Sequence, residues 1–243
     1  MNIDEALDFE QSELSDIFKP RAASEDAESF FDAIAGTVEE WEELVTCYKG
    51  ALMEMKTRFE VLNEQIAVRH GESPIETIKS RIKKPASIHE KLIRLDVPLT
   101  VASIEENIED VAGIRVVCSF MSDIYQLADC IKSQNDLKVV LEKDYIKDPK
   151  PNGYRSLHII VEVPIYLREG KKNVQVEIQF RTIAMDFWAS LEHKIRYKKN
   201  IPEDIVRQLG MDLKSTAELA NLLDERMQEI RNDMRKPFDW YEM

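Results

Sequence analysis

Four polar side chains alternate along one predicted strand. The segment VQVEIQFR, residues 174–181, places Gln175, Glu177, Gln179 and Arg181 on one side and apolar residues on the other. The apolar side predicts a buried sheet face. A carboxylate on a rigid strand beside other charged groups is how an enzyme positions a metal ion or a base. The alternative is a solvated sheet face with surface ion pairs.

A second carboxylate, Asp110, stands at the start of the apolar segment DVAGIRVVCSF, which predicts a buried strand over 110–120. Arg115 lies within that strand. An acid at the mouth of an apolar strand is a candidate metal ligand. The alternative is an ordinary turn or N-cap aspartate, which is common at such positions.

A basic strand runs into a helix over residues 75–95. Ser87 and Glu90 are spaced as a capping box, with Ser87 as the N-cap, and the helix that follows carries Lys91. Free N–H groups and the helix dipole favour anions, so this junction predicts a phosphate site. An exposed edge strand protected by lysines is the alternative. The bases on one face of the strand are Lys79, Arg81 and Lys83.

Tyr154 and Arg155 follow a turn-forming loop, DPKPNG, at residues 148–153. An aromatic ring and a guanidinium so placed can stack on a nucleobase and contact a phosphate. In the simpler interpretation, Tyr154 is a half-buried strand residue.

Two long amphipathic helices must frame these groups. The first is predicted from Thr37, as N-cap, to Gly71, and the second from Ile205 to Met234. We expect the two to pack together and to use part of their surface for subunit contacts. Shorter elements are predicted as helices at 101–107, 122–133 and from 183, strands at 137–145 and 157–164, an N-terminal helix near 25–35 and an aromatic tail at 236–243.

Charge is distributed unevenly along the 243 residues. The net charge is −13, but residues 1–40 contain twelve acids and two bases and therefore contribute −10. The remaining −3 does not exclude a polyanion site in the body of the protein. No apolar run could span a membrane and no secretory signal is recognisable. Three cysteines without a CxxC spacing indicate reduced thiols, and we expect a cytoplasmic protein.

The sequence resembles the small alarmone synthetases, the single-domain (p)ppGpp synthetases of the RelA/SpoT family. The resemblance covers about residues 45–235. It rests on SRIKKPASIHEKL (80–92), IEDVAGIRVVCSF (108–120), DYIKDPKPNGYRSLHIIVEVP (144–164), VQVEIQFRTIAMDFWASLEHKIRYK (174–198) and a C-terminal IPEDI…LDERMQEIR pattern.

The resemblance implies an α/β fold of the α+β type. The expected architecture is a nucleotidyltransferase-like mixed β-sheet flanked by helices, with long N- and C-terminal helices. The expected organisation is an acidic extension over 1–36, a synthetase domain over 37–202, and a C-terminal helix and tail for packing or oligomerisation over 203–243.

The implied activity is that of a GTP pyrophosphokinase. It transfers the β,γ-pyrophosphate of ATP to the 3′-hydroxyl of GDP or GTP, releases AMP and serves stringent-response signalling. The resemblance implies Mg²⁺ as cofactor, held by Asp110 and Glu177, with Glu177 helping to take the hydroxyl proton. It implies donor contacts from Arg81, Lys83, Ser87, Lys91 and Arg115, where the two arginines sandwich the adenine. It implies acceptor contacts from Tyr154, Arg155, His158, Gln179, Asp186 and Glu192, where Tyr154 is the platform for guanine.

Asp186 marks a departure, because some relatives have an amide at this position of the MDFW motif. An acid keeps the acceptors of an amide and loses its donors, which leaves the preference between GDP and GTP open. The four histidines are scattered through separate elements, so no alarmone hydrolase site is expected. The family often forms homotetramers, and a single-stranded RNA regulator is kept open as a partner; neither a membrane nor DNA is expected.

Two rival functions remain. A toxin-like relative with the same fold would pyrophosphorylate the 3′ end of tRNA. A non-catalytic RNA-binding module would need a broad basic face, and it would leave the two carboxylates without a role.

Overall fold

The computed structural model describes residues 38–196 and 203–234. The Thr37 N-cap, the helix near 25–35 and the aromatic tail at 236–243 lie outside these residues. The described helices are α3 (Val38–His70), α4 (Pro85–Leu95), α5 (Val101–Asn107), α6 (Met121–Lys132), α7 (Ile183–Arg196) and α8 (Glu203–Met234). The strands are β1 (Ile75–Ile82), β2 (Ala112–Cys118), β3 (Lys138–Asp144), β4 (Leu157–Leu167) and β5 (Gly170–Thr182). The predicted elements in this region are therefore confirmed, with shifts of a few residues at their ends.

The five strands form one mixed sheet in the order β1-β2-β5-β4-β3. Only β2 and β5 run parallel, while the other neighbours are antiparallel. The register aligns Gln179 with Arg115 on β2 and with His158 on β4. Because paired residues share a face, this register gathers polar side chains from three central strands on one side of the sheet.

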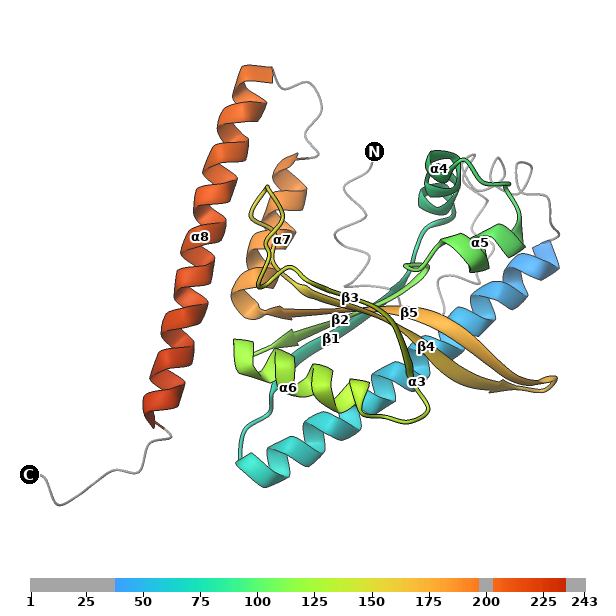
Figure 1. Ribbon diagram of the computed structural model, residues 1–243, viewed down its shortest axis with the longest axis horizontal. Coiled ribbons are helices and arrows are strands. Elements are labelled where there is room, and N and C mark those ends of the chain that lie inside the picture. Colours follow the sequence, from blue (N-terminus) through green and yellow to red (C-terminus); the bar gives the residue numbers. More distant parts are fainter. Residues whose placement is uncertain (1–37, 197–202, 235–243) are drawn as a thin grey trace, which may run out of the picture.

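The opposite side of the sheet is the apolar face, and α3 and α6 cover it (Figure 1). Alternate residues of β5 are buried there, as the period of two requires. Phe180 meets Phe59 of α3 edge to face, with ring centroids 5.6 Å apart. Fully burying one such side chain contributes about 1.5–3 kcal/mol, so this layer holds the sheet and α3 together.

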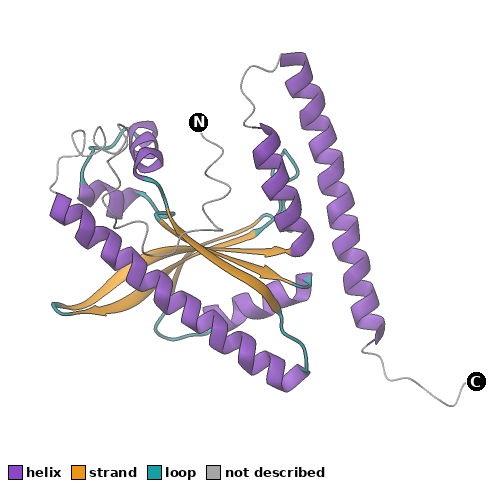
Figure 2. Ribbon diagram, turned by 180° about the vertical axis from the view of Figure 1, so that it is seen from behind, coloured by secondary structure: helices purple, strands orange, loops and turns teal. Residues whose placement is uncertain are grey.

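The expectation that the two long helices pack together is wrong. α3 crosses the apolar face of the sheet, whereas α8 stands beside α7 and α6 at one end of the molecule (Figures 1 and 2). The apolar stripe of α3 serves the core, so it is not available to α8. None of the described helices combines the length and apolarity needed to cross a bilayer.

Candidate active site

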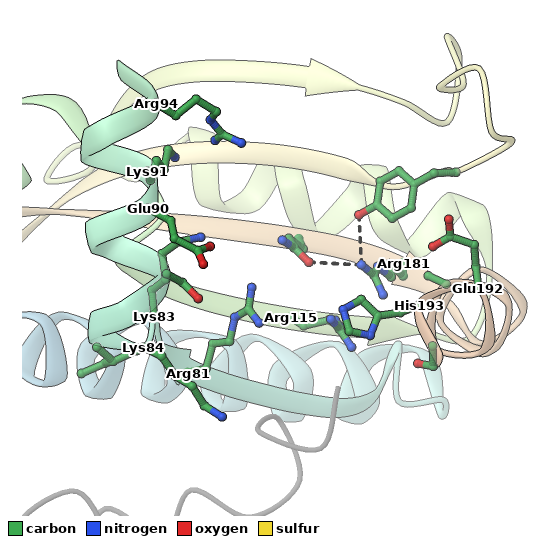
Figure 3. Close-up of a pocket in the computed structure, with 16 residues that line it drawn as sticks. Arg81, Lys83, Lys84, Glu90, Lys91, Arg94, Arg115, Arg181, Glu192 and His193 are labelled. Atoms are coloured by element: carbon green, nitrogen blue, oxygen red, sulfur yellow. Dashed lines mark hydrogen bonds between the residues drawn. The ribbon is translucent and has the colours of Figure 1, made fainter. Parts of the chain in front are cut away.

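The polar face of the sheet forms the floor of a cavity of about 590 Å³, with α4 on one side and α7 on the other (Figure 3). The predicted site residues that line it are Arg81, Lys83, Ser87, Lys91, Arg115, Tyr154, Gln179 and Glu192. Polar residues that the sequence analysis did not assign to the site also line it: Lys84, Glu90, Arg94, Arg181, Ser190 and His193. The five predicted donor residues and three of the six predicted acceptor residues, Tyr154, Gln179 and Glu192, thus line one cavity.

The α4 side of the cavity is basic, but its capping differs from the prediction. The helix begins at Pro85, and Lys84 is the N-cap with no capping hydrogen bond from its side chain. Proline at the first helical position is favoured because its fixed φ suits a helix and its missing N–H has no partner there. The prediction that Ser87 and Glu90 form a capping box is therefore wrong. The first turn of α4 also contains no acid, which suits an anion at this helix end.

Asp110 lies between two of the predicted phosphate-binding lysines. Its Oδ2 accepts from Lys83 Nζ at 3.0 Å, and its Oδ1 accepts from Lys91 Nζ at 2.6 Å. Burial raises the pKa of the Asp110 carboxyl, but the two ammonium groups outweigh burial and hold it below its ordinary value. The group is therefore an ionised carboxylate with positive partners.

Glu177 occupies the centre of the sheet floor. Its Oε1 lies 3.0 Å from His158 Nδ1, and its Oε2 accepts from Gln179 Nε2 at 2.8 Å. Burial raises the pKa of the Glu177 carboxyl, whereas His158 and then Gln179 lower it, and the net shift is downward.

Asp110 and Glu177 both line a second cavity of about 380 Å³, which shares Lys91 and Arg94 with the first. Two carboxylates beside a basic surface are a donor set that suits a divalent cation, because such a cation keeps positions for water and phosphate oxygens. The residues present thus fit a metal ion whose remaining ligands are water and the phosphate oxygens of a nucleotide. In the described part of the chain, no cluster of three or more acidic, histidine or cysteine side chains forms a metal site independent of a nucleotide.

Tyr154 is held by a network that includes a residue the prediction missed. Arg181 donates from one terminal nitrogen to the Tyr154 hydroxyl at 3.0 Å, and its guanidinium carbon lies 5.2 Å from the centre of the ring. The same hydroxyl lies 2.9 Å from His158 Nε2. Burial raises the pKa of Tyr154, but Arg181 and His158 outweigh it and lower the pKa to about 7. The sequence did indicate Arg181, because it alternates with Glu177 and Gln179 and therefore lies on the same polar face of β5.

Asp186 of α7 joins two arginines. Its Oδ1 lies 3.1 Å from a terminal nitrogen of Arg115 and accepts from Arg181 at 2.9 Å. Burial lowers the pKa of Arg115 to about 10; neighbouring Arg181 acts in the same direction and Asp186 opposes it. In this arrangement Asp186 compensates two like charges.

Two predicted acceptor residues lie at the edge of the site. Glu192 lines the larger cavity and accepts from Asn152 Nδ2 at 3.2 Å, which ties α7 to the loop before Tyr154. Arg155 donates to the carbonyl of Ile146 at 2.7 Å and lines a separate cavity against α8. The structure therefore places Arg155 behind the loop, away from the residues with which it was grouped.

Known proteins resemble this chain in sequence. Residues 80–202 match the model described as a region found in RelA / SpoT proteins. A GTP pyrophosphokinase of Bacillus subtilis (strain 168), YwaC, is 46% identical over 203 residues, which cover 84% of this chain and 96% of YwaC.

Solved structures are also similar to this chain. Small alarmone synthetase 2 from Bacillus subtilis has 45% identity and a TM-score of 0.70, with 80% of this chain and 99% of that chain covered. Small alarmone synthetase 1 from Bacillus subtilis, bound to its product pppGpp, has 38% identity and a TM-score of 0.73, with 82% and 100% covered.

Proposed function

The chain belongs to the RelA/SpoT family, as a small alarmone synthetase, and from this premise we propose that it is a GTP pyrophosphokinase that makes ppGpp and pppGpp. The 3′-hydroxyl oxygen of GDP or GTP bonds to the β-phosphorus of ATP. The bond from that phosphorus to the oxygen bridging the α-phosphate breaks, AMP leaves with that oxygen, and the hydroxyl proton passes to a base. The observation that carries the proposal is the convergence of Asp110 and Glu177 on one cavity beside a basic strand–helix junction.

The donor binds along β1 and α4 in this proposal. Lys83, Lys91 and the N-terminus of α4, including Ser87, contact the phosphates of ATP, and Arg81 and Arg115 enclose the adenine. A planar guanidinium suits that role because it combines stacking with charge. The two lysines neutralise Asp110. Phosphate oxygens of ATP can bind Lys83 and Lys91 in place of Asp110, which leaves the Asp110 carboxylate available to a cation.

Mg²⁺ is the proposed cation, held by Asp110 and Glu177, and when bound it would neutralise charge on the transferring phosphates. Glu177 also accepts the proton of the attacking hydroxyl in this proposal. His158 and Gln179 hold its carboxylate in place and keep it ionised. Positioning and charge compensation are the main contributions that a protein makes to phosphoryl-type transfer.

The acceptor binds against Tyr154, whose ring is the proposed platform for guanine. His158, Gln179 and Glu192 complete its surroundings, and Arg181 joins them because it fixes the Tyr154 hydroxyl. Asp186 acts on both nucleotides through its two arginines. Arg155 supports the loop from behind, consistent with its contact to Ile146.

The test measures transfer of label from ATP labelled at the γ-phosphate, with GDP, GTP or deacylated tRNA as acceptor. Removing either carboxylate, in Asp110→Asn or Glu177→Gln, is expected to lower kcat by roughly 10³-fold or more, because both charge compensation and proton transfer depend on them. Glu162→Gln is the matched control, since Glu162 is a sheet glutamate that pairs with Lys138. Thermal unfolding verifies that each variant is folded.

Two outcomes would overturn the proposal. Label on tRNA and none on GDP or GTP would assign the chain the rival acceptor. Near wild-type turnover by a folded Glu177→Gln variant would remove the carboxylate pair from the mechanism.

A homo-oligomer, with a tetramer favoured, completes the proposal. An apolar groove lies between α7 and α8, and it is lined on both helices by large exposed side chains. Exposed apolar surface of this extent marks an interaction site. A second copy of the chain is the proposed occupant, in keeping with the oligomers that the family resemblance implies.

A further inference from the structure

The loop that carries Tyr154 touches α8 at a point where only a glycine fits. Gly153 has a φ of +92°. A Cβ atom added to it would lie 2.6 Å from the Cβ of Ala217 and 3.5 Å from the Cα of Lys214. The first distance is far inside van der Waals contact, so the close approach requires glycine on the loop and a small residue on the helix.

Tyr154 itself packs against a small apolar cluster shared by α7 and α8. The buried members are Trp188, Ala189 and Ala217, and Leu213 and Ala220 pack against them from α8. Trp188 Nε1 donates to the carbonyl of Leu213 at 3.0 Å and to the Thr216 hydroxyl at 3.1 Å. These hydrogen bonds fix α8 to α7 at the level of the loop.

Two further contacts hold α8 along its length. Thr182, the last residue of β5, donates its hydroxyl to Asp224 at 2.6 Å. Arg231 donates to Asp123 of α6 at 2.6 Å, and both side chains are buried. The helix is therefore anchored to the sheet end that carries Arg181 and Thr182, and the surface it presents to the loop is fixed relative to the site floor.

We propose that α8, through Ala217, is a positioning element for the acceptor nucleotide: it forms the back wall that holds the 149–153 loop and the ring of Tyr154 in their binding positions. The inference rests on the proposed function and concerns its acceptor half. Donor residues come from β1, α4 and β2, and none of the contacts described for Ala217 involves them. Displacing the wall therefore affects one substrate and spares the other.

Substitutions of increasing size at Ala217 test whether α8 holds the loop and Tyr154 in place. Ala217→Ser keeps nearly the same size, whereas Ala217→Val and Ala217→Leu push progressively against Gly153. With Ala217→Leu, the KM for GDP and GTP is expected to rise roughly tenfold or more, because the displaced Tyr154 ring no longer meets the guanine in its binding position; a tenfold rise corresponds to about 1.4 kcal/mol of binding free energy. The KM for ATP is expected to stay within about twofold of the wild type, because the donor subsite is untouched. Ser215→Leu, at an exposed position of the same helix, is the matched control.

Calorimetric titration with GDP in the absence of ATP gives an independent readout, and its dissociation constant is expected to follow the same series. If Ala217→Leu does not fold, as judged by thermal unfolding, Ala217→Val carries the comparison. An unchanged KM for the guanine nucleotide in a folded Ala217→Val or Ala217→Leu variant would overturn the inference. Equal rises in both KM values would also overturn it, since they would indicate general disturbance.

The same measurements separate this inference from the proposed function. A wild-type enzyme that labels neither GDP nor GTP refutes the function, whereas the GDP titration still tests the wall. If the wild-type enzyme makes alarmone but the Ala217 variants leave the KM for the guanine nucleotide unchanged, only the positioning role of α8 is refuted.

Discussion

Among single residues, Asp186 has the most consequential surroundings. One carboxylate oxygen contacts both Arg115 and Arg181, and all three side chains are largely buried. Two like charges enclosed in a protein repel each other strongly unless a counter-charge lies between them. The geometry therefore favours a role in which Asp186 holds the two arginines, over direct recognition of the guanine edge.

Asp186→Asn tests this role. The amide keeps the shape and loses the charge, so the arginines should separate and disturb the proposed donor and acceptor subsites together. We expect the KM values for ATP and for the guanine nucleotide each to rise by roughly five- to tenfold, and stability to fall by about 1–3 kcal/mol, as for the loss of hydrogen bonds to a charged partner. Steady-state kinetics and urea unfolding measure these effects.

Asp129→Asn is the control, because Asp129 pairs with Lys132 on an exposed surface of α6. A rise confined to the KM for the guanine nucleotide would instead support recognition of the guanine edge by Asp186.

Among the elements, α8 depends on a few polar anchors for its place. Arg231 donates to Asp123 in a buried ion pair, and its guanidinium lies 4.2 Å from the centre of the Phe120 ring. Much of the apolar surface of α8 is exposed, so burial alone holds it weakly. The anchors must carry a large share of its docking energy.

Arg231→Met tests how much the Arg231–Asp123 ion pair contributes to the docking of α8. The substitution leaves Asp123 buried without its partner, and breaking a buried pair in this way typically costs about 3–5 kcal/mol. Urea unfolding measures the loss. The double variant Arg231→Met with Asp123→Leu should recover part of it, because no buried charge remains. Arg226→Met is the control, since Arg226 is exposed and pairs with Glu229 on the same helix. A loss no larger than that of the control would contradict the anchoring role.

In the whole molecule, an apolar groove lies between α7 and α8, and large exposed side chains of both helices line it. Phe187 is 67% exposed and Leu223 is 57% exposed, and both line the groove. A stable interface between subunits usually buries about 1,200–2,000 Å² in total, with an apolar centre. Aligned apolar side chains on two helices can supply such a centre.

Phe187→Glu tests the groove as the oligomer interface. Wild-type protein is expected to sediment as an oligomer, and the variant is expected to shift toward the monomer, because a buried charge opposes association. Sedimentation velocity over a range of concentrations measures the shift. Val68→Glu, at an exposed apolar position on α3, is the control. Dissociation by Val68→Glu but not by Phe187→Glu would place the interface elsewhere.

The residue pattern alone was enough to predict the helices and strands and the polar groups of the sheet face. Alternation along β5 predicted both its buried and its polar face, since the side-chain period of a strand is visible in any stretch of sequence. The same local signals located the long helices, the basic strand and the two carboxylates. The match of long ordered motifs to one family then indicated the reaction.

The pairing of these groups is visible only in the three-dimensional structure. It shows that Lys83 and Lys91 neutralise Asp110, that Asp186 links two arginines, and that α8 lies against Gly153 instead of against α3. These contacts join residues far apart in sequence. Periodicity specifies which face of an element is buried, but it does not specify which other element meets that face. The capping box failed for a local reason, because Pro85 begins the helix earlier.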